Sequence, residues 1–151
     1  MIKRTTPVDL DDANFLLADR SEDEASLLRR AFREAGILKP LHVVPDGQAV
    51  INYLRGGGSY GNRLEHPMPD AVLLDLDLPG KNGFDVLGWI RNQSDLESLV
   101  VVMLTDSNRS ADADRAHKLG ADFYLTKPDR FEELVKMTRC LHSWLGLDHF
   151  S

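Results

Sequence analysis

The sequence AVLLDLDLPG spans residues 71–80: four consecutive apolar residues lead into Asp75, and Pro79 with Gly80 forms a turn signal at its end. A strand that is apolar on both faces is normally covered by helices on both sides, as in a parallel sheet. In open parallel sheets, ligands bind just outside the carboxyl ends of the strands. The pattern therefore predicts a buried parallel strand that places Asp75 at the functional edge of a sheet.

Strand-like and helix-like segments alternate along the rest of the chain. Apolar strands are expected at 15–18, 41–44, 71–74, 99–104 and 122–126. Segments with helical periodicity follow them at 21–36, 46–54, 82–92, 110–119 and 130–145. Five such units with short links predict a doubly wound α/β sandwich. We expect one domain over 13–146, a short leader at 1–12 and a tail at 147–151.

Composition excludes several classes of function. The net charge is −6, so the chain lacks the basic field that holds nucleic acid or an anionic membrane. The longest apolar run, 99–104, is far shorter than the ~20 residues that span a bilayer, and the N-terminus has no signal-peptide pattern. The single Cys140 rules out an internal disulfide and indicates a reducing, cytoplasmic location. Its place in a helical pattern near Leu141 and Trp144 predicts a buried thiol.

The link at 56–69 is rich in Gly and Pro, and three glycines stand together at 56–58. Such a cluster can indicate a phosphate-binding loop. Here no strand precedes the glycines and no Gly-Lys-Ser/Thr sequence follows them. The segment is therefore predicted to be a flexible connection.

Polar side chains mark the ends of four predicted strands: Asp19, Asp75, Thr105 and Lys127. Because parallel strands end at the same edge of a sheet, we expect these side chains to surround one cleft. A transferred phosphoryl group carries charge on three oxygens, so cations and hydrogen-bond donors must surround it. Asp75 can attack phosphorus to give an acyl phosphate, while Lys127 and Thr105 bind the phosphoryl oxygens. Mg²⁺ held by carboxylates would neutralise the remaining charge.

Four stretches together resemble the receiver domain of two-component response regulators, over about residues 14–144. They are FLLAD at 15–19, VLLDLDLPGKNG at 72–83, VMLT at 102–105 and GADFYLTKP at 120–128. The long link before residue 71 and the last helix ending at Trp144 are similar to single-domain regulators found with bacterial phytochrome kinases. The resemblance implies a flavodoxin-like fold with strand order 2-1-3-4-5.

The resemblance also implies roles for individual residues. Asp75 would accept a phosphoryl group from a kinase phosphohistidine, and Lys127 corresponds to the lysine of the receiver site. Mg²⁺ would be bound by Asp19, by Asp75 and by the backbone carbonyl of Asp77.

A second set of implied roles concerns the response to phosphate. Thr105 and Tyr124 would form the switch pair, in which the hydroxyl and the ring reorient when the phosphate arrives. The bond between Lys127 and Pro128 is cis in the family, and such bonds usually mark a tight turn.

Arg20 is the main departure from the receiver pattern, which usually has two adjacent acids after the first strand. Replacing a −1 charge by +1 at ~5 Å from a divalent ion costs about 3 kcal/mol even in water, which lowers metal affinity roughly a hundredfold. The guanidinium has three open placements: a pair with Asp75 or Asp19, a clamp on a phosphoryl group, or an outward position in solvent. Using Glu22 or Asp23 as the second acid would put the helix start out of register.

Two acids depart from the pattern as well. Asp106 follows the switch hydroxyl, where a small uncharged residue is usual, and its charge is expected to discourage an incoming phosphate. Asp77 stands where asparagine is commoner among close relatives. Each of these two acids can also be interpreted as an ordinary acid on an exposed loop. Together with Arg20, they make the predicted pocket atypical for a receiver.

Three functional hypotheses follow. A stand-alone receiver would be phosphorylated by a histidine kinase or phosphotransfer protein and would signal through a downstream protein or its own dimer, with the polar helix at 110–119 and Trp144 as candidate contacts. A pseudo-receiver would use the fold as a binding module without phosphate. A haloacid-dehalogenase-type phosphatase would need Thr or Val in place of Pro79 and a motif at the start of the chain. We expect the first, with no enzyme activity beyond its own phosphorylation and autodephosphorylation.

Overall fold

The core of the protein is a five-stranded parallel sheet. The computed structural model describes residues 13–148, so the predicted leader at 1–12 and residues 149–151 of the predicted tail lie outside the described residues. The strands are β1 (Phe15–Ala18), β2 (His42–Val44), β3 (Ala71–Leu74), β4 (Val100–Thr105) and β5 (Phe123–Thr126). They are arranged in the order β2-β1-β3-β4-β5, and all neighbouring pairs are parallel. The predicted sheet and its strand order are confirmed.

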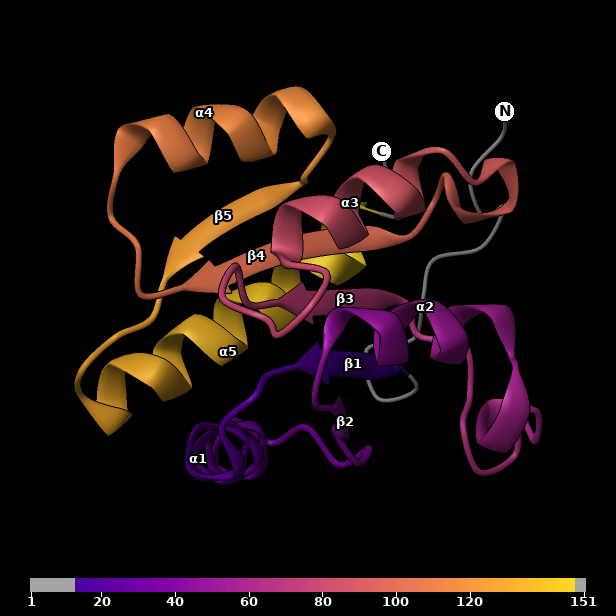
Figure 1. The fold of residues 1–151 in the computed structure, drawn as a ribbon. Helices are drawn as coiled ribbons and strands as arrows, with labels where there is room; N and C mark the ends of the chain where they lie inside the picture. The colour runs from indigo at the N-terminus through magenta and orange to yellow at the C-terminus, as the bar shows by residue number, and fades with distance from the viewer. Residues whose placement is uncertain (1–12, 149–151) are drawn as a thin grey trace.

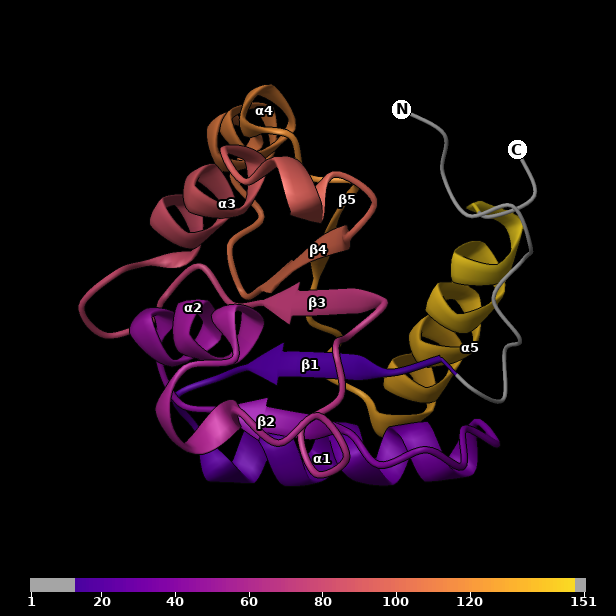
Figure 2. The same cartoon turned by 90° about the vertical axis from the view of Figure 1, so that its right-hand side faces the viewer.

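Helices cover both faces of this sheet (Figures 1 and 2). They are α1 (Glu22–Glu34), α2 (Gly47–Arg55), α3 (Gly83–Arg91), α4 (Ser110–Leu119) and α5 (Phe131–Asp148), with short 3-10 helices η2 (Gly58–Tyr60) and η3 (Ser94–Leu96). Helices α1 and α5 pack together on one face, and α2, α3 and α4 form the layer on the other. This is the doubly wound arrangement that the alternating sequence pattern predicts.

Alternate residues of each strand serve the two hydrophobic layers. In β3, Val72 and Leu74 face the layer of α2 and α3, whereas Ala71 and Leu73 face the layer of α1 and α5. All four are buried, and burying one such aliphatic side chain contributes about 1.5–3 kcal/mol. This two-sided burial explains the continuous apolar run, and it makes Asp75 the first polar residue at the strand end.

The link at 56–69 is tied down by hydrogen bonds. Helix α2 is followed by its C-cap residue Gly56, whose φ of 69° favours glycine, and then by η2. The Arg63 guanidinium donates to the carbonyl oxygens of Tyr53 at 2.9 Å and Leu54 at 3.1 Å. The Tyr53 hydroxyl donates to the Pro67 carbonyl oxygen at 3.0 Å. The glycine cluster thus ends a helix and starts a turn, and the link is more structured than the predicted plain connection.

Helix α5 corrects one prediction, because the Cys140 thiol is exposed rather than buried. The buried residues of this helix follow a single stripe at Val135, Thr138, Leu141 and Leu145. Cys140 lies outside that stripe. The prediction of a buried thiol is wrong because it relies on neighbouring apolar residues in the sequence and not on the helical face. Trp144 is half-buried and stacks on Phe123 with ring centroids 4.9 Å apart. None of the helices within residues 13–148 is long and apolar enough to cross a membrane.

Candidate functional site

The carboxyl edge of the sheet gathers the four predicted strand-end residues. Asp19 follows β1, Asp75 follows β3, Thr105 ends β4 and Lys127 follows β5, and the strand arrows in Figure 1 point to this edge. Asp19, Asp75 and Thr105 are buried although they are polar. Gly83 allows α3 to start close by, because a Cβ atom there would lie 2.5 Å from the Asp75 carbonyl oxygen.

Lys127 is the centre of the site. Its Nζ lies 2.9 Å from Asp75 Oδ2, 2.9 Å from Glu24 Oε2 and 3.4 Å from Asp19 Oδ2. Burial alone would lower the pKa of this ammonium, but hydrogen bonds to Glu24 and Asp75 and the negative charges around it outweigh burial and raise the pKa. Lys127 is therefore fully charged at neutral pH and neutralises part of a cluster of three acids.

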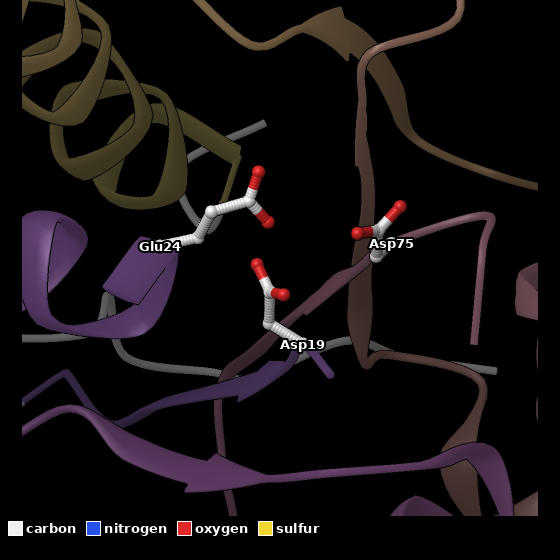
Figure 3. A group of neighbouring side chains, drawn as sticks. All are labelled: Asp19, Glu24 and Asp75. Atoms are coloured by element: carbon white, nitrogen blue, oxygen red, sulfur yellow. The ribbon is translucent and has the colours of Figure 1, made fainter. Parts of the chain in front are cut away.

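The three carboxylates point toward one another (Figure 3). One oxygen of each of Asp19, Glu24 and Asp75 lies within 4.8 Å of the others. Burial is the main reason that the pKa of Asp19 is raised, although the Ser21 N–H and Lys127 oppose it. Burial also opposes ionisation of Glu24, but its hydrogen bond and charge interaction with Lys127 lower its pKa. The two neighbouring acids therefore have pKa values shifted in opposite directions. In Glu24 the hydrogen bond and charge of Lys127 outweigh the effect of burial, whereas in Asp19 burial outweighs the Ser21 N–H and the charge of Lys127.

Glu24 is the site residue that sequence reasoning misses. Ser21 caps α1, and its Oγ accepts from the Glu24 N–H at 3.2 Å. In a capping box the acid at this position would reach back to the N–H of the cap residue. That Ser21 N–H already donates to Asp19 Oδ1 at 2.9 Å, so the Glu24 side chain is available to Lys127. The Ser-x-x-Glu spacing is the signal that could have found it, whereas Glu22 and Asp23 are exposed and outside the cluster.

Arg20 does not pair with Asp19 or Asp75, which corrects one of its expected placements. Its Nη1 lies 3.5 Å from Asp77 Oδ2, and the two side chains are 56% and 84% exposed. Lys127 already occupies the Oδ2 atoms of Asp19 and Asp75, so the guanidinium turns to the acid that remains in solvent. An ion pair this exposed contributes at most about 1 kcal/mol.

The two predicted switch residues are connected through Ser107. Thr105 Oγ1 accepts from the Ser107 N–H at 3.2 Å, and the Tyr124 hydroxyl donates to the Ser107 carbonyl oxygen at 2.9 Å. The Ser107 hydroxyl donates to Asp112 Oδ2 at 2.6 Å, which together with Arg109 lowers the pKa of Asp112. The loop after β4 is thereby attached to both members of the pair.

An open cavity of about 900 Å³ adjoins Asp75. Thr105 and Arg20 line it, and so does the exposed Asp106, which places an acid at the cavity as the sequence predicts. Asp77 is exposed, and its N–H donates to Asp75 Oδ1 at 3.1 Å.

The peptide bond that joins Lys127 to Pro128 is trans, so the expected cis bond is wrong for this chain. Trans is also the intrinsic preference of such bonds, by about 0.5–1 kcal/mol. The Lys127 ammonium reaches all three carboxylates with the bond in this form.

A comparison with family models matches residues 15–139 to the response regulator receiver domain. The chain belongs to the response regulator receiver family. The match covers every strand and the site described above, and the receiver fold agrees with the observed strand order.

Individual relatives support the same assignment. The receiver is 34% identical over 131 residues to response regulator Rcp1 of Synechocystis sp., covering 86% of this chain and 87% of Rcp1. It is 36% identical over 135 residues to the probable methanogenesis regulatory protein FilR2 of Methanothrix harundinacea, covering 87% and 83%.

Solved structures show the same fold. The Mn²⁺-bound form of Rcp1 has a TM-score of 0.77 at 33% identity, covering 88% of this chain and 94% of that one. The phosphorylated cyanobacterial phytochrome response regulator RcpA has a TM-score of 0.79 at 27% identity, covering 88% and 93%. Related receivers have thus been observed both with a divalent metal and in a phosphorylated form.

The acidic cluster of this receiver fits a divalent metal. Carboxylate oxygens are the ligands that Mg²⁺ and Mn²⁺ accept, and Asp19, Glu24 and Asp75 each offer one at mutual distances within 4.8 Å. Position 20 is occupied by Arg, and Glu24 in the first turn of α1 is the third acid of this cluster. The backbone carbonyl of Asp77 stays a predicted ligand.

Proposed function

We propose that this receiver accepts a phosphoryl group on Asp75 from the phosphohistidine of a histidine kinase or phosphotransfer protein. The observation that supports it most strongly is the placement of Asp75. Its carboxylate follows the buried strand β3, is bound by Lys127 at 2.9 Å and adjoins an open cavity that a donor can enter. A carboxylate held beside an ammonium suits attack on phosphorus.

In the proposed transfer, an Asp75 oxygen forms a bond to phosphorus while the nitrogen–phosphorus bond of the donor breaks. The imidazole leaves with the electron pair of that bond. The Asp77 N–H holds Asp75 Oδ1, which fixes the orientation of the carboxylate. The Lys127 ammonium is close enough to neutralise a phosphoryl oxygen, and Thr105 supplies a hydroxyl that can bind another.

A divalent cation, with Mg²⁺ as the expected ion, would be held by Asp19, Glu24 and Asp75. When bound, it neutralises phosphoryl oxygens during the transfer. Lys127 contacts the same three carboxylates, so its ammonium competes with the cation for them. We infer that Glu24 compensates for Arg20 and that metal affinity is limited by this competition.

The test is to incubate the protein with acetyl phosphate, with and without Mg²⁺, and to measure the intact mass. We expect the addition of one phosphate in the wild type and none in Asp75→Asn. Asp114→Asn, which changes an exposed acid on α4, is the matched control and should be modified as the wild type is. Unchanged mass in the wild type, beside a reactive Arg20→Asp variant, contradicts the proposal.

A second candidate is a pseudo-receiver that binds its partner without phosphate. Two observations favour it: Lys127 already binds all three carboxylates, and Arg20 stands where an acid is usual. Under this alternative, partner binding is the same for wild type and Asp75→Asn in the presence of acetyl phosphate. A steady release of phosphate from small monoesters would instead indicate the phosphatase hypothesis.

We further propose that the signal leaves this cytoplasmic receiver through contacts with a downstream protein or a second copy of the chain. Tyr124 and Thr105 are both bound to the loop that leads into α4. A phosphate on Asp75 adds a charge of about −1.5 to −2, which would draw the Thr105 hydroxyl away from Ser107 and release the ring of Tyr124. The surface of α4 would then change with the phosphorylation state.

A further inference from the structure

A second cavity, of about 520 Å³, lies beside the outer edge of the sheet and shares no lining residue with the carboxyl-edge cavity. Its walls come from the second half of α1, from residues 37–44 and from the aromatic residues Tyr53, Tyr60 and His66. Its volume lies within the range of ligand-binding pockets. The lining is largely apolar, and Leu38 on its rim is 84% exposed.

The charge of this cavity is opposite to that of the molecule. Arg29, Arg33 and Lys39 line it together with His42 and His66, and no Asp or Glu within residues 13–148 does, although the chain carries a net charge of −6. None of the three permanent cations has an ion pair with any other residue in the described part of the chain. Burial lowers the pKa of His42, and the positive charges of its neighbours lower it further. The cavity therefore attracts negative charge.

Strand β2 supplies the floor of the cavity and is an open edge of the sheet. It pairs with β1 on one side only, and Figure 2 shows it as the outermost strand beside α1. The Val44 carbonyl oxygen accepts from the Asp19 N–H at 3.1 Å and so faces β1. Because successive backbone groups of a strand point to opposite sides, the N–H and carbonyl of Val43 face away from β1. These groups are free to pair with a further strand.

We propose that the β2 edge binds an extended acidic peptide segment of a partner protein, which adds a sixth strand to the sheet. The backbone of the peptide would pair with Val43, its apolar side chains would enter the cavity, and its carboxylates would lie against Arg33 and Lys39. Strand addition combines backbone hydrogen bonds for affinity with side-chain pockets for specificity. The binding does not depend on phosphorylation of Asp75.

A second copy of the chain is a poorer occupant of the same edge. Symmetric pairing of two β2 edges places the same patch of both copies face to face. It would bring Arg29, Arg33 and Lys39 of one copy against the same residues of the other, and like charges in a contact are repulsive. Charge complementarity thus favours an acidic partner.

The test uses a synthetic decapeptide with capped ends in which Glu alternates with Val. Binding is followed by the amide resonances of the isotope-labelled full-length protein. We expect the Val43 amide to shift and to exchange more slowly with solvent as the peptide is added. A peptide N-methylated on alternate backbone nitrogens loses the donors needed for strand pairing, and a version with Lys in place of Glu carries the wrong charge. Both are expected to bind at least about tenfold more weakly, a difference of about 1.4 kcal/mol.

Charge-reversal variants test the residues. The double variant Arg33→Glu with Lys39→Glu is expected to weaken peptide binding about tenfold. Lys118→Glu with Lys136→Glu makes the same change of net charge at exposed positions on α4 and α5 and should have less than about a threefold effect. If the first double variant does not fold, Lys39→Glu alone and the N-methylated peptide decide the question.

Several results would overturn the proposal. They are the absence of binding at millimolar peptide, equal binding of the N-methylated or Lys peptide, and shifts that leave the β2 amides unchanged. Inorganic tripolyphosphate that binds the same residues as tightly as the peptide would show a simple anion site instead. A concentration-dependent dimer whose β2 amides shift would show that a second copy is the occupant.

Discussion

At the scale of single residues, Lys127 balances a cluster that would otherwise repel itself. The Lys127 side chain is 12% exposed, and its ammonium contacts three carboxylates, of which Asp19 and Asp75 are nearly inaccessible to solvent. Removing one partner from a buried ionic contact leaves the other charges desolvated and unpaired, which costs more than the pair itself contributes. The cluster is therefore sensitive to this one side chain.

The first prediction concerns Lys127→Met. We expect the free energy of unfolding at pH 7 to fall by about 2–4 kcal/mol. Because the pKa of Lys127 is raised, the stability that it contributes is present in full below its ordinary value of 10.5 and is lost only as the pH rises through the folded-state pKa. In the variant, Asp19 and Glu24 lose their counter-charge and bind protons more readily, so the deficit should shrink between pH 7 and pH 5. Urea unfolding at both pH values measures this.

Lys136→Met is the control for this prediction, because it removes an exposed lysine whose ion pair with Glu133 is long, at 3.9 Å. It should change the stability by no more than about 0.5 kcal/mol at either pH. A Lys127→Met variant as stable as the wild type at pH 7 would show that the cluster is not held together by the ammonium.

His42 gives a second prediction, on pH dependence. Burial and the positive charges of His66, Arg29 and Lys39 lower its pKa from 6.5. The folded state with a neutral His42 ring therefore has its full stability above pH 6.5. As the pH falls below 6.5, the unfolded chain takes up the proton before the folded state does, and the free energy of unfolding decreases. His42→Gln should therefore lose less stability than the wild type between pH 7 and pH 5 in urea unfolding. His117→Gln, at an exposed position on α4, should follow the wild type; equal slopes for the wild type and both variants would contradict the prediction.

Residues of the site differ in how far sequence can predict them. Asp19 and Asp75 follow directly after buried apolar strands and Lys127 follows β5, so strand direction alone places them at one edge. Glu24 lies on a helix, and its contact with Lys127 depends on the orientation of α1 relative to the sheet. It also depends on the hydrogen bond from the Ser21 N–H to Asp19, which leaves the Glu24 side chain available. Sequence spacing contains neither quantity.

At the scale of secondary-structure elements, α1 connects the fold to the site. Its buried stripe packs on the sheet, while its first turn presents Glu24 to Lys127. Helix α4 is different, since Ala116 is its only buried residue and its N-cap residue Arg109 makes no side-chain cap bond. This limited burial agrees with the polar sequence of residues 110–119.

A third prediction tests the start of α1 with Ser21→Ala. The variant loses the hydroxyl that accepts from the Glu24 N–H at 3.2 Å, and loss of such a cap typically costs about 1 kcal/mol. For a chain of this size the midpoint of thermal unfolding should fall by about 2–4 °C. Ser26→Ala, at an exposed position within the same helix, is the control and should have a smaller effect. Equal midpoints for the two variants would exclude a capping role.

Elements buried on both faces are the most predictable from sequence. In β3, for example, Val72 is buried in one hydrophobic layer and the next residue, Leu73, in the other. Both faces of the strand are therefore apolar, and its sequence is a continuous apolar run. Helix phase is less certain: Cys140 lies beside Leu141 in sequence but on the exposed side of α5. The Arg63 guanidinium donates to the carbonyl oxygens of Tyr53 and Leu54, ten and nine positions earlier in the chain, and composition does not reveal these hydrogen bonds.

At the scale of the whole molecule, the two cavities divide the surface by charge. Acids surround the carboxyl edge, where a cation and a phosphoryl donor would enter, whereas the described residues that line the β2-edge cavity include cations and no acid. The carboxyl-edge cluster also sets a limit on metal binding, because the Lys127 ammonium contacts one oxygen of each of the three carboxylates and competes with a cation for those oxygens. Metal affinity and the native ion pairs are therefore linked, so a substitution that removes the ion pairs should also change the metal affinity.

The last prediction follows from this linkage and is measured by thermal unfolding with added Mg²⁺. A ligand that binds only the native state, at ten times its Kd, stabilises it by about 1.4 kcal/mol, which raises the midpoint by about 3–6 °C for a chain of this size. Glu24→Gln should reduce the shift at the same Mg²⁺ concentration, whereas the exposed Glu22→Gln should not. Lys127→Met should start from a lower midpoint yet gain a larger shift, because its carboxylates no longer have a competing ammonium. A smaller shift in Lys127→Met than in the wild type would mean that the cation binds elsewhere, because competition at the three carboxylates permits only an increase.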